Sequence, residues 1–177
     1  KGLGEMVCQI PHSLSLIRPV FLYPFIVNND GLAEFNKYLA AKSMAVNVVQ
    51  ADIRDTDIEN ASMVVLNYTL QFLDLQDRDA IVQRIYDGMN DGGLLVLSEK
   101  VVDEDPEMEV LLVDLHREHK RRNNYSSLEI SQKRTALENV LIPETVSAHR
   151  DRLRKTGFAS TAVWLRYFNF VSVIAIK

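Results

Sequence analysis

The sequence contains a single cysteine, Cys8, among its 177 residues. No disulfide can therefore form within one chain, which fits a reducing compartment. The sequence also lacks an apolar run of the ~18 residues that a membrane-spanning helix needs. Its longest apolar stretch near the start, residues 14–27, is interrupted by an arginine and two prolines. No basic segment leads into a continuous apolar core, as in a signal peptide. These absences predict a cytoplasmic location with no membrane attachment.

The chain also lacks an excess of positive charge, because 20 lysines and arginines face 24 acidic residues and give a formal net charge of -4. Proteins that bind nucleic acid through their own surface usually carry a basic face that neutralises phosphates. Only one short basic run is present, at residues 120–122. Direct binding of nucleic acid is therefore disfavoured. The length and the 47% hydrophobic content favour one globular domain over residues 1–177.

Several sequence motifs that identify a catalytic or metal-binding function are missing. There is no Gly-x-Ser-x-Gly, no Walker motif and no cysteine cluster, so hydrolase, P-loop and zinc functions have no support. His116 and His119 are three residues apart in a predicted helix and could share a metal ion. No third ligand lies nearby in the sequence, so two surface histidines are the favoured interpretation.

From about residue 46 onward, the spacing of apolar residues predicts alternating strands and helices. The short runs 46–49, 63–66 and 94–97 are typical of strands that are buried on both faces. Residues 75–89 have the spacing of an amphipathic helix, with Arg78 on its polar side, and the turn residues 90–93 should end it. Strands and helices that alternate with short joins indicate an α/β fold with a parallel sheet.

The segments on either side of this core are also predicted. Before it, residues 25–27 form a short apolar run and residues 32–41 have helical spacing. After it, helices are expected over 106–122 and 127–141, and a third begins near Pro143 and ends at Gly157. The extended runs 160–168 and 170–177 form either a hairpin or one bent strand at the edge of the sheet.

Ligands of open parallel sheets bind beyond the carboxyl ends of the strands, so the residues that follow each predicted strand are candidate ligand contacts. They include Asn28 and Asn29, Asp52 and Ile53, and Asn67. The Asp52 carboxylate can accept a hydrogen bond from an amine or a ribose hydroxyl, and Ile53 can pack against an adenine face. The alternative for Asp52 is a helix or turn cap. Asn67 can bind an amino-acid group, because an amide both donates and accepts, or it can serve as a turn residue.

Arg134 lies in a polar segment of the second predicted helix. Its guanidinium can pair with a carboxylate through two hydrogen bonds. The alternative is a solvent-exposed position on the helix surface, where Arg134 would have no ligand.

Longer stretches resemble the carboxy-S-adenosylmethionine synthase family. These stretches are residues 52–55, 58–73, 94–100, 128–140 and the closing Phe168-Asn169-Phe170. The resemblance covers about residues 46–177. It implies a Rossmann-like class I methyltransferase sheet that is mostly parallel with an antiparallel C-terminal edge, in a protein that is usually a homodimer.

The beginning of the chain departs from that family. Residues 1–25 match poorly, and only residues 2–4, Gly-Leu-Gly, resemble the end of the family's glycine-rich loop. We therefore expect the first strand and this loop to be missing or truncated. The loss of the backbone donors in that loop predicts weak or absent cofactor binding by this chain.

The resemblance implies an unusual transferase reaction. S-adenosyl-L-methionine and prephenate would yield carboxy-S-adenosyl-L-methionine and phenylpyruvate, and a partner enzyme would use the product to modify a wobble uridine of tRNA. Asp52 and Ile53 would bind the adenine, and Asn67 would contact the ligand. Arg134, from the neighbouring subunit, would be the catalytic residue that recognises the added carboxylate.

Asn28 and Asn29 stand where the family has an Asp-Asn pair that holds the ribose. Two alternatives stay open. A conventional small-molecule methyltransferase of the same fold would differ only in the segment around Arg134. A degenerate remnant that dimerises without catalysis is favoured by the expected loss of the first strand and by Asn28.

Overall fold

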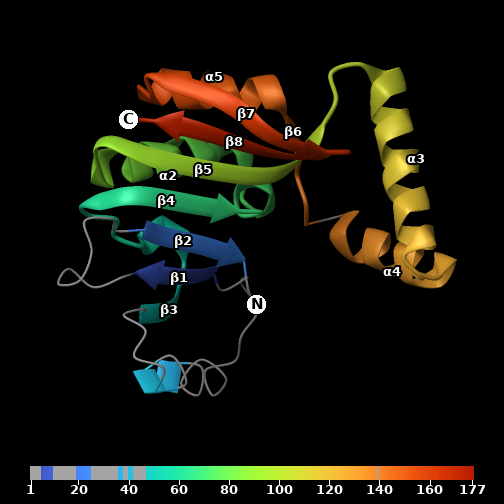
Figure 1. Cartoon of the computed structure of the whole chain (residues 1–177), viewed down its shortest axis with the longest axis horizontal. Coiled ribbons are helices and arrows are strands. Elements are labelled where there is room, and N and C mark those ends of the chain that lie inside the picture. Colours follow the sequence, from blue (N-terminus) through green and yellow to red (C-terminus); the bar gives the residue numbers. More distant parts are fainter. Residues whose placement is uncertain (1–4, 10–18, 25–35, 38–39, 42–46, 139) are drawn as a thin grey trace.

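An eight-stranded mixed sheet forms the centre of the protein (Figure 1). The structure is a computed structural model, and it describes residues 5–9, 19–24, 36–37, 40–41, 47–138 and 140–177. In the order in which they pair, the strands are β3 (Asn47–Ala51), β1 (Glu5–Gln9), β2 (Pro19–Pro24), β4 (Ala61–Asn67), β5 (Met89–Val102), β8 (Phe170–Ile176) and β7 (Ser160–Tyr167). A short strand, β6 (Glu144–Thr145), also pairs with β5.

Most strands run in one direction. β2 pairs parallel with β4, and β4 pairs parallel with β5. β3 shares this direction, because β3 and β2 both pair antiparallel with β1. β8 is reversed between β5 and β7. The predicted mostly parallel sheet with an antiparallel C-terminal edge is thus confirmed, whereas the reversed β1 was not foreseen.

The buried core lies on one face of the sheet, under the helices α2 (Leu75–Gly88) and α5 (Val146–Thr156). Alternate residues of the central strands point into it, and so does the apolar side of α2. These core residues include Val64, Leu66, Leu95, Leu97, Ile81, Val82 and Ile85. Full burial of each such side chain contributes about 1.5–3 kcal/mol. The intervening strand residues, such as Val65 and Val96, are half-buried, so the opposite face is less covered than the sequence predicted.

The ends of both helices have local causes. α2 stops at Gly88, where an added Cβ would lie 1.8 Å from the carbonyl oxygen of Ile58, so only glycine fits. The predicted turn 90–93 lies inside the extended segment that begins at Met89, and the pairing register shifts there. α5 begins where the Thr145 hydroxyl accepts a hydrogen bond from the Ala148 N–H at 3.2 Å. It ends before Gly157, whose φ of 119° is in the left-handed range.

An ion cluster joins α2 to β6 and α5. The sequence placed Arg78 on the polar side of α2, but its side chain is 0% exposed. Its guanidinium donates to Glu144 on β6 and to the carbonyl oxygens of Leu73 and Ile142. Arg152 of α5 donates to the other oxygen of Glu144 at 2.8 Å. Arg78 is buried because this tertiary contact neutralises it, which the helical pattern does not show.

Two helices lie beyond the carboxyl ends of the central strands, α3 (Pro106–Arg122) and α4 (Ser127–Glu138) (Figure 1). The Asp105 carboxylate caps α3 and accepts the Glu107 N–H at 2.8 Å. No described residue of α3 is fully buried. The last two strands form a hairpin, which decides between the two arrangements that the sequence left open.

The early predicted segments are described in part. The apolar run 25–27 lies outside the described residues. Within 32–41, residues 36–37 and 40–41 are helical.

Candidate functional site

The carboxyl edge of the sheet brings two of the predicted residues to one side of the molecule. Asp52 directly follows β3, and Asn67 is the last residue of β4. Because β3, β2, β4 and β5 share a direction, their carboxyl ends lie along the same edge. Arg134 belongs to α4, which lies beyond this edge, but its side chain is outside the described residues. Asn28 and Asn29 also lie outside the described residues.

Asp52 begins a short 3-10 helix, η1 (Ile53–Asp55), and its side chain acts as a cap. Its Oδ1 accepts the Arg54 N–H at 2.9 Å, and its Oδ2 accepts the Arg54 guanidinium at 2.6 Å. The side-chain hydrogen bond from Arg54 holds the pKa of Asp52 below its ordinary value. Asp52 is thus an ionised acceptor whose side chain is still 39% exposed. Ile53 is 2% exposed and packs in the core.

Tyr68 turns the chain sharply after Asn67. Its φ of 56° is in the left-handed region, which is uncommon for a bulky side chain. The Tyr68 N–H donates to the Ser98 carbonyl oxygen at 2.7 Å, which holds the turn against β5. The Tyr68 ring packs edge-on against Phe170 of β8, with 5.8 Å between the ring centroids. Burial, with a smaller contribution from the charge of Glu99, raises the pKa of Tyr68.

Glu99 of β5 fixes the segment that follows Tyr68. Its carboxylate is 1% exposed and accepts the backbone N–H groups of Thr69, Leu70 and Gln71, at 3.1, 2.9 and 3.1 Å. The last two belong to the 3-10 helix η2 (Leu70–Phe72). Burial raises the pKa of Glu99 to about 7, although the three backbone hydrogen bonds oppose this shift. The sequence assigned no role to Glu99, and its place at a strand end was the only signal.

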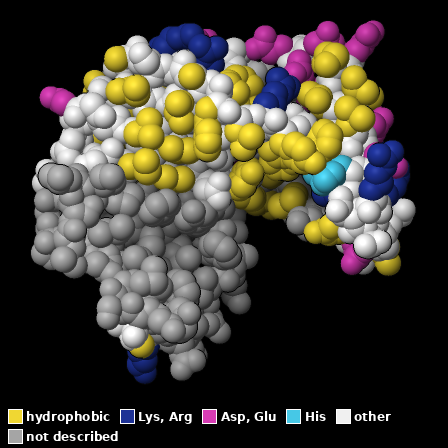
Figure 2. Space-filling model, in the orientation of Figure 1, with side chains coloured by type: hydrophobic (Ala, Val, Ile, Leu, Met, Phe, Trp, Pro, Cys, Tyr) yellow, Lys and Arg dark blue, Asp and Glu magenta, His cyan; other side chains and the backbone are white. Residues whose placement is uncertain are grey.

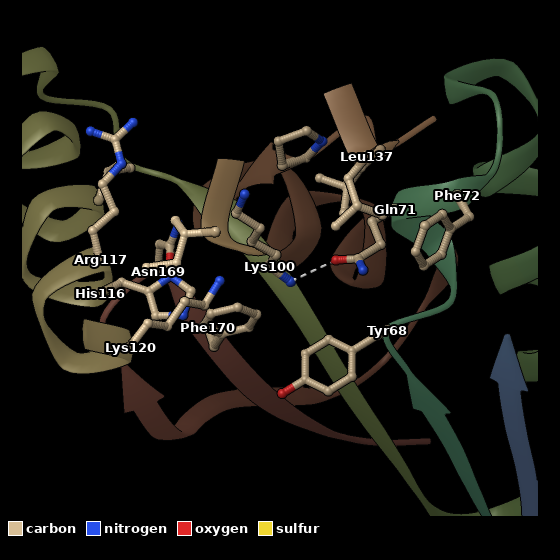
Figure 3. A pocket seen from close by; sticks show the side chains of 14 residues that line it. Tyr68, Gln71, Phe72, Lys100, His116, Arg117, Lys120, Leu137, Asn169 and Phe170 are labelled. Atoms are coloured by element: carbon tan, nitrogen blue, oxygen red, sulfur yellow. Dashed lines mark hydrogen bonds between the residues drawn. The ribbon is translucent and has the colours of Figure 1, made fainter. Parts of the chain in front are cut away.

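A pocket of about 560 Å³ opens between this edge and the helices α3 and α4. Figure 3 shows Tyr68, Gln71 and Phe72 on the sheet side, facing His116, Arg117 and Lys120 of α3. Lys100 lies between them, and its backbone N–H donates to the Gln71 Oε1 at 2.9 Å. The rest of the lining is Val113, Ile130, Leu137, Leu141, Pro143, Asn169 and Phe170. This size and this mixed lining are typical of a small-molecule site.

The two histidines of α3 contact aromatic rings. His116 lies 5.1 Å from the Phe170 ring and His119 lies 5.4 Å from the Tyr167 ring, centroid to centroid. Among the described residues, no group of three or more potential ligands could hold a metal ion.

None of the described helices has the length and the apolar character to cross a membrane.

The chain is similar along its whole length to carboxy-S-adenosyl-L-methionine synthase of Shewanella frigidimarina. The two are 58% identical over 177 residues, which are 100% of this chain and 68% of that protein. The proteins of the same name from Aliivibrio fischeri ES114 and Shewanella oneidensis are 54% and 55% identical over 132 residues. The chain spans 54% of the length of each of these two relatives. No model of a protein family matches the chain.

Solved structures with the same arrangement are methyltransferases and related proteins. The pyocyanin biosynthetic protein PhzM has a TM-score of 0.57 and 18% identity, over 83% of this chain and 39% of its own. Human N-acetylserotonin methyltransferase in complex with SAM has a TM-score of 0.50 and 16% identity, over 73% of this chain and 33% of its own. At such identities the likeness shows the fold alone, which is that of the class I methyltransferases.

Proposed function

Because the chain belongs to the carboxy-S-adenosyl-L-methionine synthase family, we propose that it converts S-adenosyl-L-methionine and prephenate into carboxy-S-adenosyl-L-methionine, phenylpyruvate and water. The observation that carries this proposal is the 58% identity over all 177 residues with the Shewanella frigidimarina protein of that name. The fold supports it, since the methyltransferase sheet places Asp52 and Asn67 at one edge.

The described residues at this edge fit an S-adenosyl ligand. Asp52 is ionised and accessible, so it can accept a hydrogen bond from an adenine amine or a ribose hydroxyl. Ile53 lies next to it, and its side chain, which is 2% exposed, would border the adenine site from the core side. The Asn67 amide would contact the amino-acid group. Asn28 and Asn29 would hold the ribose. Asp52 and Asn67 lie at the ends of different strands, so the sheet fixes their relative positions.

In the proposed reaction, bound S-adenosyl-L-methionine supplies a sulfonium-activated methyl group, the carbon that receives the carboxyl group. Arg134 would pair with the carboxylate as it forms, and such a charge-assisted contact contributes roughly 1.5–3 kcal/mol. Enclosure between the sheet edge and α4 would hold both substrates together. Proximity of this kind lowers a barrier by as much as ~7–11 kcal/mol.

The proposal includes a homodimer in which Arg134 comes from the neighbouring subunit. The exposed apolar residues of β7 support such an assembly, since Trp164 is 60% and Leu165 is 56% exposed. Figure 2 shows hydrophobic side chains gathered on one face of the molecule, from the sheet towards α3. A partner enzyme would then use the product on a wobble uridine of tRNA, in the cytoplasm. The net charge of -4 fits a protein that handles small molecules and leaves the RNA to its partner.

Mass spectrometry tests the activity directly. The purified protein is incubated with S-adenosyl-L-methionine and prephenate, and the small molecules are released by denaturation. A mass of S-adenosyl-L-methionine plus one carboxyl group supports the proposal, and Arg134→Ala should lose that product while the matched change Arg122→Ala keeps it. Release of only S-adenosyl-L-methionine or its demethylated product would favour a conventional methyltransferase. Release of no adenosyl compound would favour a degenerate remnant.

A further inference from the structure

The two oxygens of the Glu99 carboxylate accept hydrogen bonds from different residues of one turn. Oε1 accepts the N–H groups of Thr69 and Leu70, at 3.1 and 2.9 Å, and Oε2 accepts the N–H of Gln71 at 3.1 Å. All four residues are buried. The loss of any of these bonds would leave an N–H group unpaired away from water, so the turn keeps its shape only while both oxygens accept.

The first side of this turn begins at the end of β4. Asn67 is the last residue of that strand, and Tyr68 follows with a φ of 56°. A bulky residue keeps this left-handed conformation only where its surroundings hold it. The Tyr68 N–H donates to the carbonyl oxygen of Ser98, and Glu99 accepts the next three N–H groups. Two successive residues of β5 therefore fix the path of the chain after Asn67.

The second side of the turn contacts the segment that follows α4. The Gln71 carbonyl oxygen accepts the Ile142 N–H at 2.8 Å, and the Gln71 Oε1 accepts the Lys100 N–H at 2.9 Å (Figure 3). The Ile142 carbonyl oxygen in turn accepts the guanidinium of the buried Arg78 at 2.7 Å. Gln71 is thus held at three points, and one of them, its backbone N–H, depends on Glu99.

A buried carboxylate at this edge of the sheet could act in two ways. Its charge could attract a cationic ligand, or its two oxygens could hold the backbone in place. The structure favours the second, because both oxygens already accept N–H groups and Glu99 is 1% exposed, which leaves a ligand almost no surface to contact.

We propose that Glu99 is a positioning residue that holds both sides of the ligand site: the turn after Asn67 and, through Gln71, the segment that follows α4. It acts through backbone N–H groups and does not contact the ligand. Its effect on S-adenosyl-L-methionine rests on the proposed function, in which Asn67 and Arg134 contact that ligand. Its effect on the shape of the turn is independent of that function.

Glu99→Gln tests how the two oxygens are divided. Glutamine has nearly the same shape, but one of its end atoms is a nitrogen that donates and cannot accept. Because two N–H groups share Oε1, the amide oxygen should keep Thr69 and Leu70 and the nitrogen should face Gln71. Amide hydrogen exchange of the ligand-free protein should become about tenfold faster at Gln71 and Ile142, with little change at Thr69 and Leu70.

This exchange experiment is best done at pH 8. Burial raises the pKa of Glu99 to about 7, so the wild-type carboxyl is ionised there and both of its oxygens accept. The measurement is made by NMR, residue by residue. A general loss of stability would speed exchange at all four amides, so the pattern separates a local effect at Gln71 from global unfolding.

Glu99→Asp separates the geometry of the side chain from its charge. Aspartate keeps the charge, but it is one methylene shorter and cannot reach all three N–H groups. In calorimetric titrations, the affinity for S-adenosyl-L-methionine should fall about tenfold in Glu99→Gln and further in Glu99→Asp. Glu109→Gln is the matched control and should keep the affinity, because Glu109 also accepts a backbone N–H, from Asp103 at 2.8 Å, but at the start of α3.

Urea denaturation at pH 8 shows whether the loss of affinity follows from a loss of stability. Glutamine brings no charge into the core, so Glu99→Gln should be at least as stable as the wild type while it binds the ligand more weakly. A parallel loss of stability and affinity in Glu99→Gln would contradict a positioning role.

Two further results would overturn the proposal: unchanged exchange at Gln71 in Glu99→Gln, or tighter ligand binding by Glu99→Asp than by Glu99→Gln. If the wild type binds no S-adenosyl-L-methionine, the proposed function fails, and the exchange pattern still decides whether Glu99 holds the turn. If the wild type forms the carboxylated product while Glu99→Gln exchanges and binds like the wild type, the proposed function stands and the positioning role fails.

Discussion

Glu144 accepts a hydrogen bond from Arg78 at 2.5 Å, and the arginine side chain is completely buried. Glu144→Gln would keep the shape and remove the charge that balances Arg78 and Arg152. Loss of one partner from a buried ion cluster costs about 3–5 kcal/mol, because the remaining charge stays out of water. We expect a fall in the free energy of unfolding near the low end of this range, measured by urea denaturation.

The matched control for this change is Glu118→Gln. Glu118 pairs with Arg121 and Arg122 on the surface of α3. Exposed pairs of this kind contribute about 0–1 kcal/mol. Similar losses in the two variants would show that the Arg78 cluster does not stabilise the fold as described.

Glu99 should give the protein an unusual response to pH. Burial raises its pKa from 4.5 to about 7. Between these values the unfolded chain releases the proton while the folded chain keeps it, so Glu99 lowers stability as the pH rises through this window. The effect amounts to roughly 3 kcal/mol. Glu99→Gln should remove this contribution, so its urea midpoint should rise relative to that of the wild type as the pH is raised from 4.5 to 7.

The pKa shift of His149 has the opposite effect on how stability changes with pH. Burial lowers its pKa from 6.5 to about 4, so between these values the unfolded chain binds a proton that the folded chain lacks. Stability therefore rises with pH through this window, by roughly 3 kcal/mol from this residue. The wild-type slopes should nearly cancel between pH 4.5 and 6.5. Stability should rise across this range in Glu99→Gln and fall in His149→Gln, and two flat profiles would contradict the opposed shifts.

Asp52 and Arg54 should have opposite effects on ligand affinity. Asp52→Asn should weaken S-adenosyl-L-methionine binding about tenfold, because the ligand loses a charged acceptor. Arg54→Gln should leave the affinity unchanged or higher, since Arg54 occupies both oxygens of that carboxylate in the structure. Calorimetric titration compares the two. A loss in Arg54→Gln as large as in Asp52→Asn would mean that the cap itself shapes the site.

The proposed homodimer can be tested at β7. Leu165→Lys places a charge within the exposed apolar strand, beside Trp164. If β7 forms the subunit contact, burial of that charge is costly and the variant should be monomeric. Light scattering after size exclusion measures the mass. Gln83→Lys, on the exposed side of α2, is the control and should remain dimeric; a dimeric Leu165→Lys would exclude β7 from the interface.

The elements that sequence reasoning found are those with a strong local pattern. The strand at 63–66, the helix that begins at Leu75 and the two closing strands all follow the spacing of apolar residues, and each is present. The features that it missed depend on distant partners. Arg78 is buried by a glutamate 66 positions away, and Glu99 holds N–H groups 28 to 30 positions away.

The residues of the candidate site were likewise predicted only where a local pattern marks them. Strand ends located Asp52 and Asn67, because direction in a parallel sheet follows from the order of strands and helices. The reversed direction of β1 could not be predicted from the sequence, because its five residues carry no signal of strand direction. Asn169 and Lys120 meet across the pocket only through the placement of α3 and the hairpin, which no local pattern specifies.

Two strands, β1 and β2, separate β3 from β4 in the sheet, so the carboxyl ends that carry Asp52 and Asn67 are three strand spacings apart. At about 4.8 Å for each spacing, this distance across the sheet is about 14 Å. The spacing of the strands therefore sets the length of a ligand that contacts both residues. If Asp52 and Asn67 bind the ligand as proposed, a bare nucleoside would be held at one end only, whereas a nucleoside with an extended amino-acid arm would reach both residues at once.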